Sequence, residues 1–133
     1  MGSFVIPAMR YRDPHKMIDW LCDSFGFTRK AVYDDGNGGV AHAELTLGDG
    51  MIMLGSARDD DFAKVMQPAT ADRPVTQSAY VVVPDADAVY ARAKTNGATI
   101  VLDISDKDYG GRDFTCRDPE GHVWSIGTYD PWK

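Results

Sequence analysis

The sequence of 133 residues contains few cysteines and no long apolar run. Its two cysteines, Cys22 and Cys116, form no CxxC pair and no Cys/His cluster, so the motifs of zinc fingers and dithiol redox proteins are missing. Both are expected to be inert thiols buried in the core. No apolar segment approaches the ~18 residues of a membrane-spanning helix, and the N-terminal residues lack the basic segment of a secretory signal. We therefore expect a cytoplasmic protein with no membrane partner.

Basic residues are also in deficit. The chain has 14 Lys and Arg against 20 Asp and Glu, a formal net charge of -6 and a pI near 4.8. An acidic surface repels phosphate backbones, so nucleic acid is not expected as a partner. The charges are scattered apart from a short run at residues 58–61, which is typical of a solvated turn. With 44% hydrophobic residues, the chain has the balance of a folded domain.

The same pattern occurs twice along the chain. Asp13 and Asp85 lie 72 residues apart, and each follows an extended apolar segment and precedes apolar residues at helical spacing. Aspartate is a favoured N-cap, so each is expected to begin a helix. Gly26 and Gly97, 71 residues apart, come where these helices should end, as glycine commonly does.

Strands and glycine-rich turns follow in both halves at nearly the same offset. The expected order is therefore β-α-β-β-β, repeated once: an α+β fold of two tandem units that make one domain over residues 1–133. We place unit one at about residues 4–55, a linker with a short helix around 61–66 at about 56–74, and unit two at about 75–129. The expected strands are residues 4–11, 28–33, 40–47, 51–55, 75–83, 99–103, 112–117 and 122–128.

This order resembles the vicinal-oxygen-chelate superfamily of glyoxalases, bleomycin-resistance proteins and dioxygenases. The opening Tyr11-Arg12-Asp13, the later Phe25-Gly26-Phe27 and the closing segment 118–124, DPEGHVW, resemble motifs of that superfamily. The resemblance covers nearly the whole chain. It implies that each unit curls its strands into half of a cup with the helix outside, and that the cup holds a ligand and is often completed in a homodimer.

Alternation along residues 40–47 predicts which side chains face the cup. Every second residue is apolar and should pack under a helix: Ala41, Ala43, Leu45 and Leu47. The opposite face then carries Val40, His42, Glu44 and Thr46. His42 and Glu44 are therefore predicted to point together into the cup, as polar ligand contacts or as a structural ion pair.

The resemblance also allows a test for a metal. Metal-dependent members chelate with His or Glu from four strands, seven residues before each helix cap and on the last strand of each unit. Those positions hold Ile6, Ser78, Ser125 and Leu54. Leu54 is taken as the repeat counterpart of Ser125 because it lies 71 residues before it. Aliphatic carbons donate no lone pair and serine hydroxyls are poor ligands for transition metals. No metal and no other cofactor is therefore expected, although His42 and Glu44 could join a third ligand at a different site.

Other candidate ligand contacts come from the remaining strands of the expected cup. Arg112, after Gly110-Gly111, is interpreted as either an anion contact at the rim or a plain surface arginine. Trp124 is interpreted as core. The remaining candidates are Arg10, Tyr80, Asp113, Thr115 and Ser125.

Three functions remain open at this point, because one fold hosts many functions. The first is a metal-independent protein that binds a small molecule, like the bleomycin-resistance branch. The second is an enzyme, a glyoxalase-like lyase or isomerase or a dioxygenase-type enzyme, with a relocated or absent metal and His42 and Glu44 as the general base and its orienting group. The third is a domain whose cup is filled by side chains and which acts by dimerisation.

Overall fold

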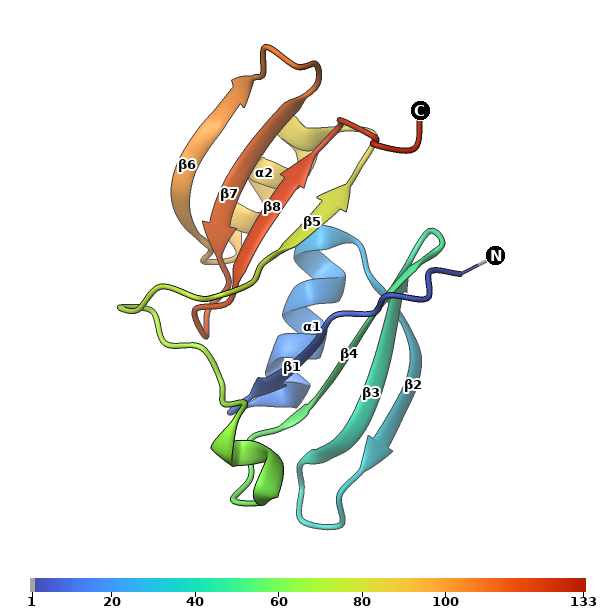
Figure 1. Ribbon diagram of the computed structural model, residues 1–133, viewed down its shortest axis with the longest axis vertical. Coiled ribbons are helices and arrows are strands. Elements are labelled where there is room, and N and C mark those ends of the chain that lie inside the picture. The colour runs from blue at the N-terminus through green and yellow to red at the C-terminus, as the bar shows by residue number, and fades with distance from the viewer. Residues whose placement is uncertain (1) are drawn as a thin grey trace. The chain divides into compact units, whose positions relative to one another are not determined.

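A computed structural model describes residues 2–133, and within them the chain forms two compact units, Met1–Ala69 and Thr70–Lys133. Each unit contains one α-helix and one four-stranded sheet in the order β-α-β-β-β (Figure 1). The α+β fold of tandem units predicted from the repeat is confirmed. No helix within residues 2–133 is long and apolar enough to cross a membrane.

The sheet of unit 1 has the strand order β1-β4-β3-β2, with β1 parallel to β4 and the other pairs antiparallel. A short 3-10 helix, η1 (Asp61–Lys64), follows the sheet, within the segment where a short helix was expected. The other elements are β1 (Ala8–Tyr11), α1 (Pro14–Phe25), β2 (Thr28–Asp34), β3 (Val40–Leu47) and β4 (Gly50–Ser56).

Unit 2 repeats this topology, with the strand order β5-β8-β7-β6 and β5 parallel to β8. Figure 1 shows the helix of each unit on one face of its own sheet. The face turned away from the helix is called the open face below. The elements are β5 (Ala79–Val82), α2 (Ala86–Thr95), β6 (Thr99–Asp106), β7 (Arg112–Arg117) and β8 (Val123–Gly127).

Both helices begin and end where the sequence predicts. The carboxylate of Asp13 accepts the amide of Lys16 at 3.3 Å, and that of Asp85 accepts the amide of Ala88 at 3.1 Å. These bonds satisfy N–H groups that have no partner within the helix. Gly26 ends α1 with a φ of 91°, a left-handed conformation that glycine adopts without steric cost.

The face of each sheet that packs against its helix forms the core. In unit 1, Ala43, Leu45, Ile52 and Leu54 are at most 4% exposed, and the apolar stripe of α1 covers them. In unit 2 the buried strand residues are Phe114, Cys116, Trp124 and Ile126. The predicted burial is thus observed at Ala43 and Leu45 of β3, whereas Ala41 and Leu47, predicted to share that face, are only half-buried. Buried and half-buried residues also alternate in β7 and β8. Cys22 differs from expectation, because it is only partly buried on α1.

Val40 does not lie on the face of β3 where it was predicted, which is the face of His42. Val40 is fully buried, like Ala43 and Leu45. Tyr33 pairs with His42 but Asp34 pairs with Val40, so β3 contains one extra residue at Ala41. Such a bulge inverts the alternation beyond it and returns Val40 to the core side.

The first strand of each unit is shorter than predicted. β1 begins at Ala8 rather than at residue 4, because Pro7 has no N–H to donate to a ladder, and Phe4 and Val5 before it are almost fully exposed. β5 likewise begins at Ala79 rather than at residue 75. The apolar side chains of residues 4–5 therefore lie outside the sheet.

The closing DPEGHVW segment is held together by hydrogen bonds to the side chain of Asp118. Asp118, 3% exposed, accepts the amides of Glu120, Gly121 and His122 at 3.0 to 3.1 Å, and its other oxygen accepts the indole N–H of Trp124 at 3.0 Å. One carboxylate thus closes the turn before β8 and fixes the largest core side chain of unit 2. This motif of the resemblance therefore stabilises the fold of unit 2.

Candidate functional site

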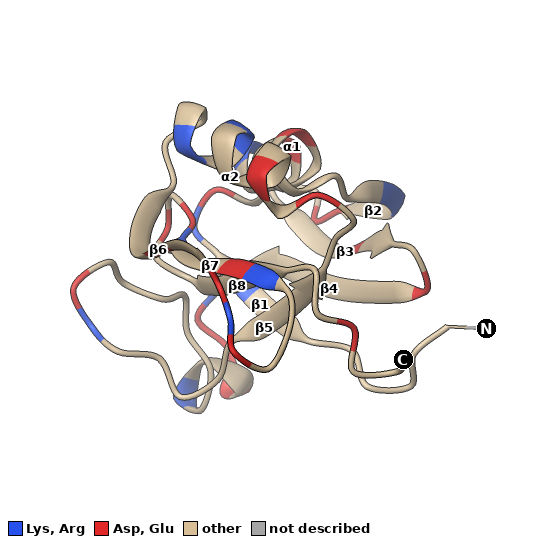
Figure 2. Cartoon of the chain, turned by 90° about the horizontal axis from the view of Figure 1, so that it is seen from above, with Lys and Arg blue, Asp and Glu red and all other residues tan. Residues whose placement is uncertain are grey.

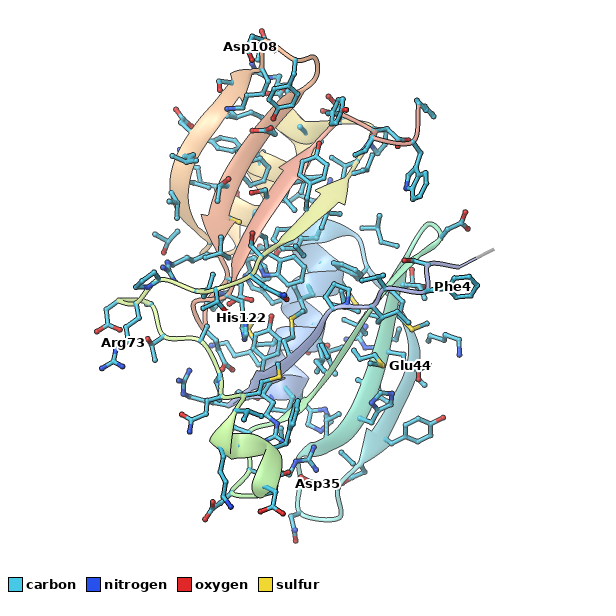
Figure 3. All side chains as sticks on the ribbon, viewed as in Figure 1. Phe4, Asp35, Glu44, Arg73, Asp108 and His122 are labelled. Carbon is cyan, nitrogen blue, oxygen red and sulfur yellow. The ribbon has the colours of Figure 1, made fainter. Side chains whose placement is uncertain are left out.

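The His42 and Glu44 side chains meet on the open face of unit 1. His42 Nε2 lies 2.9 Å from Glu44 Oε2, and both residues are half-buried on β3. The ring of Tyr33, the β2 neighbour of His42 in the ladder, stacks on the imidazole at 6.2 Å between centroids. Figure 3 labels Glu44 on this strand. The pair predicted from alternation is therefore assembled in the folded chain.

Glu44 also contacts a cation from the neighbouring strand. Lys30 Nζ on β2 lies 3.2 Å from Glu44 Oε1, so each carboxylate oxygen has its own partner. The hydrogen bonds from His42 and then Lys30 lower the pKa of Glu44 below its usual range. Glu44 is therefore ionised at neutral pH and presents an oriented negative charge on the open face.

The open face of unit 2 carries hydroxyl groups in the matching row. Ser125 on β8 is paired with Tyr80 on β5 and with Thr115 on β7. The hydroxyls of Thr115 and Ser125 share a hydrogen bond of 2.8 Å. The corresponding row in unit 1 is Ala8, Met53 and Glu44. The two open faces thus have the same backbone and different chemistry.

Tyr109 contacts Asp113 at the end of the unit 2 sheet, and Tyr129 and Tyr80 extend this cluster. The hydroxyl of Tyr109 donates to Asp113 Oδ2 at 2.8 Å, and Tyr109 packs edge-on against Tyr129 at 5.4 Å. The hydroxyl of Tyr80 donates to the Tyr129 carbonyl at 2.8 Å. Lys107 Nζ lies 3.3 Å from the other oxygen of Asp113. The hydrogen bond to Asp113 raises the pKa of Tyr109, and burial, followed by the charge of Asp113, raises that of Tyr80.

The two predicted arginines of the site are already engaged within the chain. Arg10, 8% exposed, forms a two-pronged ion pair with Asp60 at 2.8 and 2.9 Å. Arg112 contacts Asp87 and Asp106 at 3.1 to 3.3 Å. Both guanidinium groups therefore hold neighbouring segments of their own unit.

Sequence reasoning missed Lys30, Tyr109 and Tyr129 as neighbours of the candidate residues. Lys30 was detectable in principle, because it lies on the strand expected to pair with that of Glu44. Tyr109 and Tyr129 lie in the turn before β7 and in the segment after β8, where no periodicity indicates the direction of a side chain.

The comparisons with known proteins assign the family. The profile of the Glyoxalase/Bleomycin resistance protein/Dioxygenase superfamily matches residues 4–126. The chain belongs to this superfamily. Uncharacterised proteins of Mycobacterium bovis and Mycobacterium tuberculosis are each 31% identical over 140 residues, covering 96% of this chain and 86% and 77% of their own lengths.

Solved structures of the superfamily share the fold. TioX from Micromonospora sp. ML1 is 30% identical with a TM-score of 0.72, and the match covers 94% of both chains. The fosfomycin resistance protein FosX from Mesorhizobium loti is 16% identical with a TM-score of 0.66, covering 99% of this chain and 96% of that one. A FosX from Listeria monocytogenes, 10% identical with a TM-score of 0.70 and covering 99% of this chain and 96% of its own, was solved with Mn(II) and sulfate.

The residues of this chain do not fit the metal of the metal-dependent relatives. The strand pairing first corrects one position: Met53, not Leu54, is the unit 1 counterpart of Ser125, and Leu54 is buried under the helix. The four positions therefore hold Ile6, Met53, Ser78 and Ser125. Residues 2–133 contain no group of three His, Cys, Asp or Glu side chains that could hold a metal ion. A thioether and two hydroxyls do not replace the nitrogen and carboxylate ligands of zinc, iron or manganese.

Proposed function

We propose that the protein binds a small organic molecule on the open faces of its sheets without the help of a metal. The observation that carries this proposal is the identity of the residues that pair across the strands on each open face. At two positions where metal-dependent relatives have His or Glu, this chain has the thioether of Met53 and the hydroxyl of Ser125. Small polar and apolar groups of this kind suit the recognition of an organic ligand.

The polar groups around the row indicate the kind of ligand. Glu44 and Asp113 each present a carboxylate held by neighbouring residues, and tyrosine rings lie beside Asp113. Carboxylates and aromatic faces together favour a ligand with a cationic or hydrogen-bond-donating group. The further contacts in the proposal are Tyr80, Thr115 and Ser125.

We test the proposal by titrating the protein with a panel of small organic amines and their neutral analogues, using calorimetry. We expect at least one amine to bind, and Glu44→Gln and His42→Ala to weaken it by about tenfold, the scale of one charge-assisted hydrogen bond. Asp49→Asn in the β3–β4 turn is the matched control, because it removes one exposed carboxylate of the same unit. Unchanged affinity in both site variants, with native circular dichroism, would remove His42 and Glu44 from the site.

The hydrogen bond between His42 and Glu44 also favours a second function. A carboxylate that accepts from one imidazole nitrogen can orient the ring so that the other nitrogen takes a proton from a substrate. A metal-free lyase or isomerase of this kind would lose turnover in His42→Ala while keeping substrate affinity. Loss of affinity without any turnover in the wild type favours the binding protein.

The proposed assembly is a homodimer in the cytoplasm. The expectation comes from the superfamily resemblance and from the exposed apolar side chains of β6, Val101 and Leu102, which are 50% and 59% exposed. Pairing of two copies would cover surfaces of this kind. Sedimentation at micromolar concentration tests it, and a monomer would contradict it.

A further inference from the structure

Both asparagines of the chain are followed by glycine, at Asn37-Gly38 and at Asn96-Gly97. An asparagine before glycine is prone to spontaneous deamidation, because glycine has no side chain to hinder the attack of its backbone nitrogen on the asparagine side chain. Each unit contains one such pair, in the β2–β3 turn of unit 1 and at the end of α2 in unit 2. The reacting groups of the two pairs are identical, so the backbone that holds them decides how they differ in the folded protein.

Exposure does not distinguish the two pairs. Both asparagines and both glycines are exposed to solvent, so water reaches all of them. The hydrogen bonds of the backbone do distinguish them. The nitrogen that attacks is the backbone amide of the glycine, and this amide must turn toward the asparagine side chain before it can react. A hydrogen bond from the same amide opposes that movement.

The pair in unit 2 is fixed by the end of α2. Asn96 is the C-cap of this helix, with a φ of -89° and a ψ of 11°. The Gly97 amide donates to the Lys94 carbonyl at 3.2 Å. The next amide, that of Ala98, donates to the Ala93 carbonyl at 2.9 Å. Two bonds of this kind close a helix around a left-handed glycine, and Gly97 has a φ of 94°. The nitrogen that would attack Asn96 is therefore bonded, and its peptide plane is held from both sides.

The pair in unit 1 is held on either side of the reacting amide but not at it. Asp35 Oδ1 accepts the amide of Asn37 at 2.7 Å and that of Gly39 at 2.9 Å. Figure 3 labels Asp35 in this turn. Within residues 2–133, the Gly38 amide between them donates no hydrogen bond, and the Asn37 side chain makes none. Gly38 has a φ of 83°, and the space that a Cβ would occupy is open. The nitrogen that would attack Asn37 is therefore free to turn toward it.

We propose that Asn37 is a site of spontaneous deamidation in the folded protein and that the fold protects Asn96. The Gly38 nitrogen, after losing its proton to solvent base, forms a bond to the side-chain carbonyl carbon of Asn37. The bond from that carbon to the amide nitrogen breaks, and the nitrogen takes a proton from water and leaves as ammonia. Water then opens the resulting succinimide ring at either carbonyl, which leaves an ordinary aspartate or an isoaspartate at position 37. The net reaction consumes one water and releases one ammonia, so it needs no oxidant, metal or enzyme.

Both products change the turn. The new carboxylate adds one negative charge to the formal -6 of the chain, in a turn that already contains Asp34 and Asp35. Figure 2 shows acidic and basic residues interspersed along the chain, so the added charge makes this turn a more acidic stretch than its surroundings. Isoaspartate also lengthens the backbone by one methylene. Gly39 is packed closely, since a Cβ added there would collide with the side chains of Asp35 and Ser56. The isoaspartate form should therefore lose the bond from the Gly39 amide to Asp35, and this amide should exchange faster with solvent.

The test ages the full chain in mildly alkaline buffer and follows both asparagines by peptide mapping with mass spectrometry. We expect Asn37 to convert at least about tenfold faster than Asn96, because Asn96 reacts only after a backbone hydrogen bond opens, and one such bond lowers the open population by about tenfold. In urea, where neither turn is formed, the two asparagines should convert at similar rates.

The matched variants are Asn37→Gln and Asn96→Gln. Glutamine keeps a neutral amide but would have to close a six-membered ring, which forms far more slowly. On isoelectric focusing, Asn37→Gln should abolish the acidic species that appears on ageing, and Asn96→Gln should leave it unchanged. Circular dichroism establishes that both variants fold. Conversion of Asn96 as fast as Asn37 in the native protein would overturn the proposal. An equally large preference for Asn37 in urea would also overturn it, because the fold would then not be the cause. The same holds if native Asn37 stays intact over a time in which the chain in urea converts.

Discussion

The two units share their buried side and differ on their open side. Beneath each helix, the third and fourth strands present apolar residues at matching ladder positions, with Ile52 in unit 1 where Trp124 stands in unit 2. On the open faces, Glu44 in unit 1 corresponds to Thr115 in unit 2, and Met53 corresponds to Ser125. The chemistry of the repeat is thus retained where side chains pack and changed where they are accessible.

This difference distinguishes core residues, which folding constrains, from open-face residues, which are available for binding. A core position needs only volume and apolarity, so a repeated backbone accepts similar residues at both copies. An open face has no such requirement, and its residues can specialise. The open face of unit 1 carries a charged pair, and that of unit 2 carries hydroxyl and tyrosine groups.

We expect Trp124 to contribute more to the free energy of unfolding than Ile52, its counterpart in unit 1. Trp124→Ala should lower the free energy of unfolding by about 4 kcal/mol, and Ile52→Ala by about 3 kcal/mol, because both leave cavities. Trp124→Phe, which keeps an aromatic ring but loses the hydrogen bond to Asp118, should cost about 2 kcal/mol. Urea denaturation measures all three. If Trp124→Ala lowered the free energy of unfolding by less than Ile52→Ala does, the placement of Trp124 in the core would be contradicted.

Gly50, the first residue of β4, and Gly121, in the turn before β8, should respond differently to alanine. Gly121 has a φ of 102°, and an added Cβ would lie 2.7 Å from the Thr70 backbone, whereas Gly50 has no such φ and only the Leu47 carbonyl at 3.3 Å. Gly121→Ala should therefore cost about 2 kcal/mol or more, and Gly50→Ala less than about 1 kcal/mol. The same denaturation assay measures both. Equal effects would show that the two turns are equivalent.

The two cysteines should differ in their reactivity toward alkylation. Burial raises the pKa of Cys116 to about 12, while Cys22 is partly exposed on α1, where burial raises its pKa to a lesser degree. Iodoacetamide at pH 8 should modify Cys22 at least about tenfold faster than Cys116 in the native protein, by peptide mapping. Equal rates without denaturant would place Cys116 outside the core.

The raised pKa of Cys116 also predicts the direction of a pH effect. The unfolded thiol ionises near its ordinary pKa of 9.0, and the folded thiol only near 12. The unfolded state therefore loses its proton first, and the folded state is destabilised as the pH rises above about 9. Cys116→Ala should flatten this alkaline slope in a series of denaturation curves. An unchanged slope would contradict the burial of the thiol.

The smallest expected effect concerns Glu44. Its pKa is lowered in the folded state, so its contribution to stability is present above its ordinary pKa near 4.5 and is lost as the pH falls through the folded value. The difference in stability between the wild type and Glu44→Gln should therefore shrink below pH 4.5. Thr115→Val at the matching position of unit 2 should show no such dependence. A difference that stays constant down to pH 3 would contradict the ion pairs of Glu44.

Much of the fold could be predicted from the sequence because local signals mark it. Asp13 and Asp85 as caps, Gly26 as a helix stop and the alternation along β3 each act over a few residues. The same alternation brought His42 and Glu44 together correctly. The bulge that turns Val40 to the core was not predictable, since it depends on how β2 and β3 pair.

The parts of the candidate site that the sequence did not predict depend on contacts between distant residues. Arg10, a predicted ligand contact, forms an ion pair with Asp60, 50 residues away, that the sequence did not indicate. The offset between the units changes by one residue in the turn before the last strand, which makes Met53 rather than Leu54 the counterpart of Ser125, and this change is visible only in the ladder. Tyr109 and Tyr129 meet through side chains from two separate irregular segments.

The central claim is that the protein holds an organic ligand without a metal, and native mass spectrometry of protein purified from cells tests it most directly. We predict an adduct of organic mass on the wild type, a reduced adduct on Glu44→Gln, and no stoichiometric zinc, nickel, manganese or iron by elemental analysis of the same sample. About one such metal per chain, lost together with the adduct on treatment with a chelator, would contradict the claim.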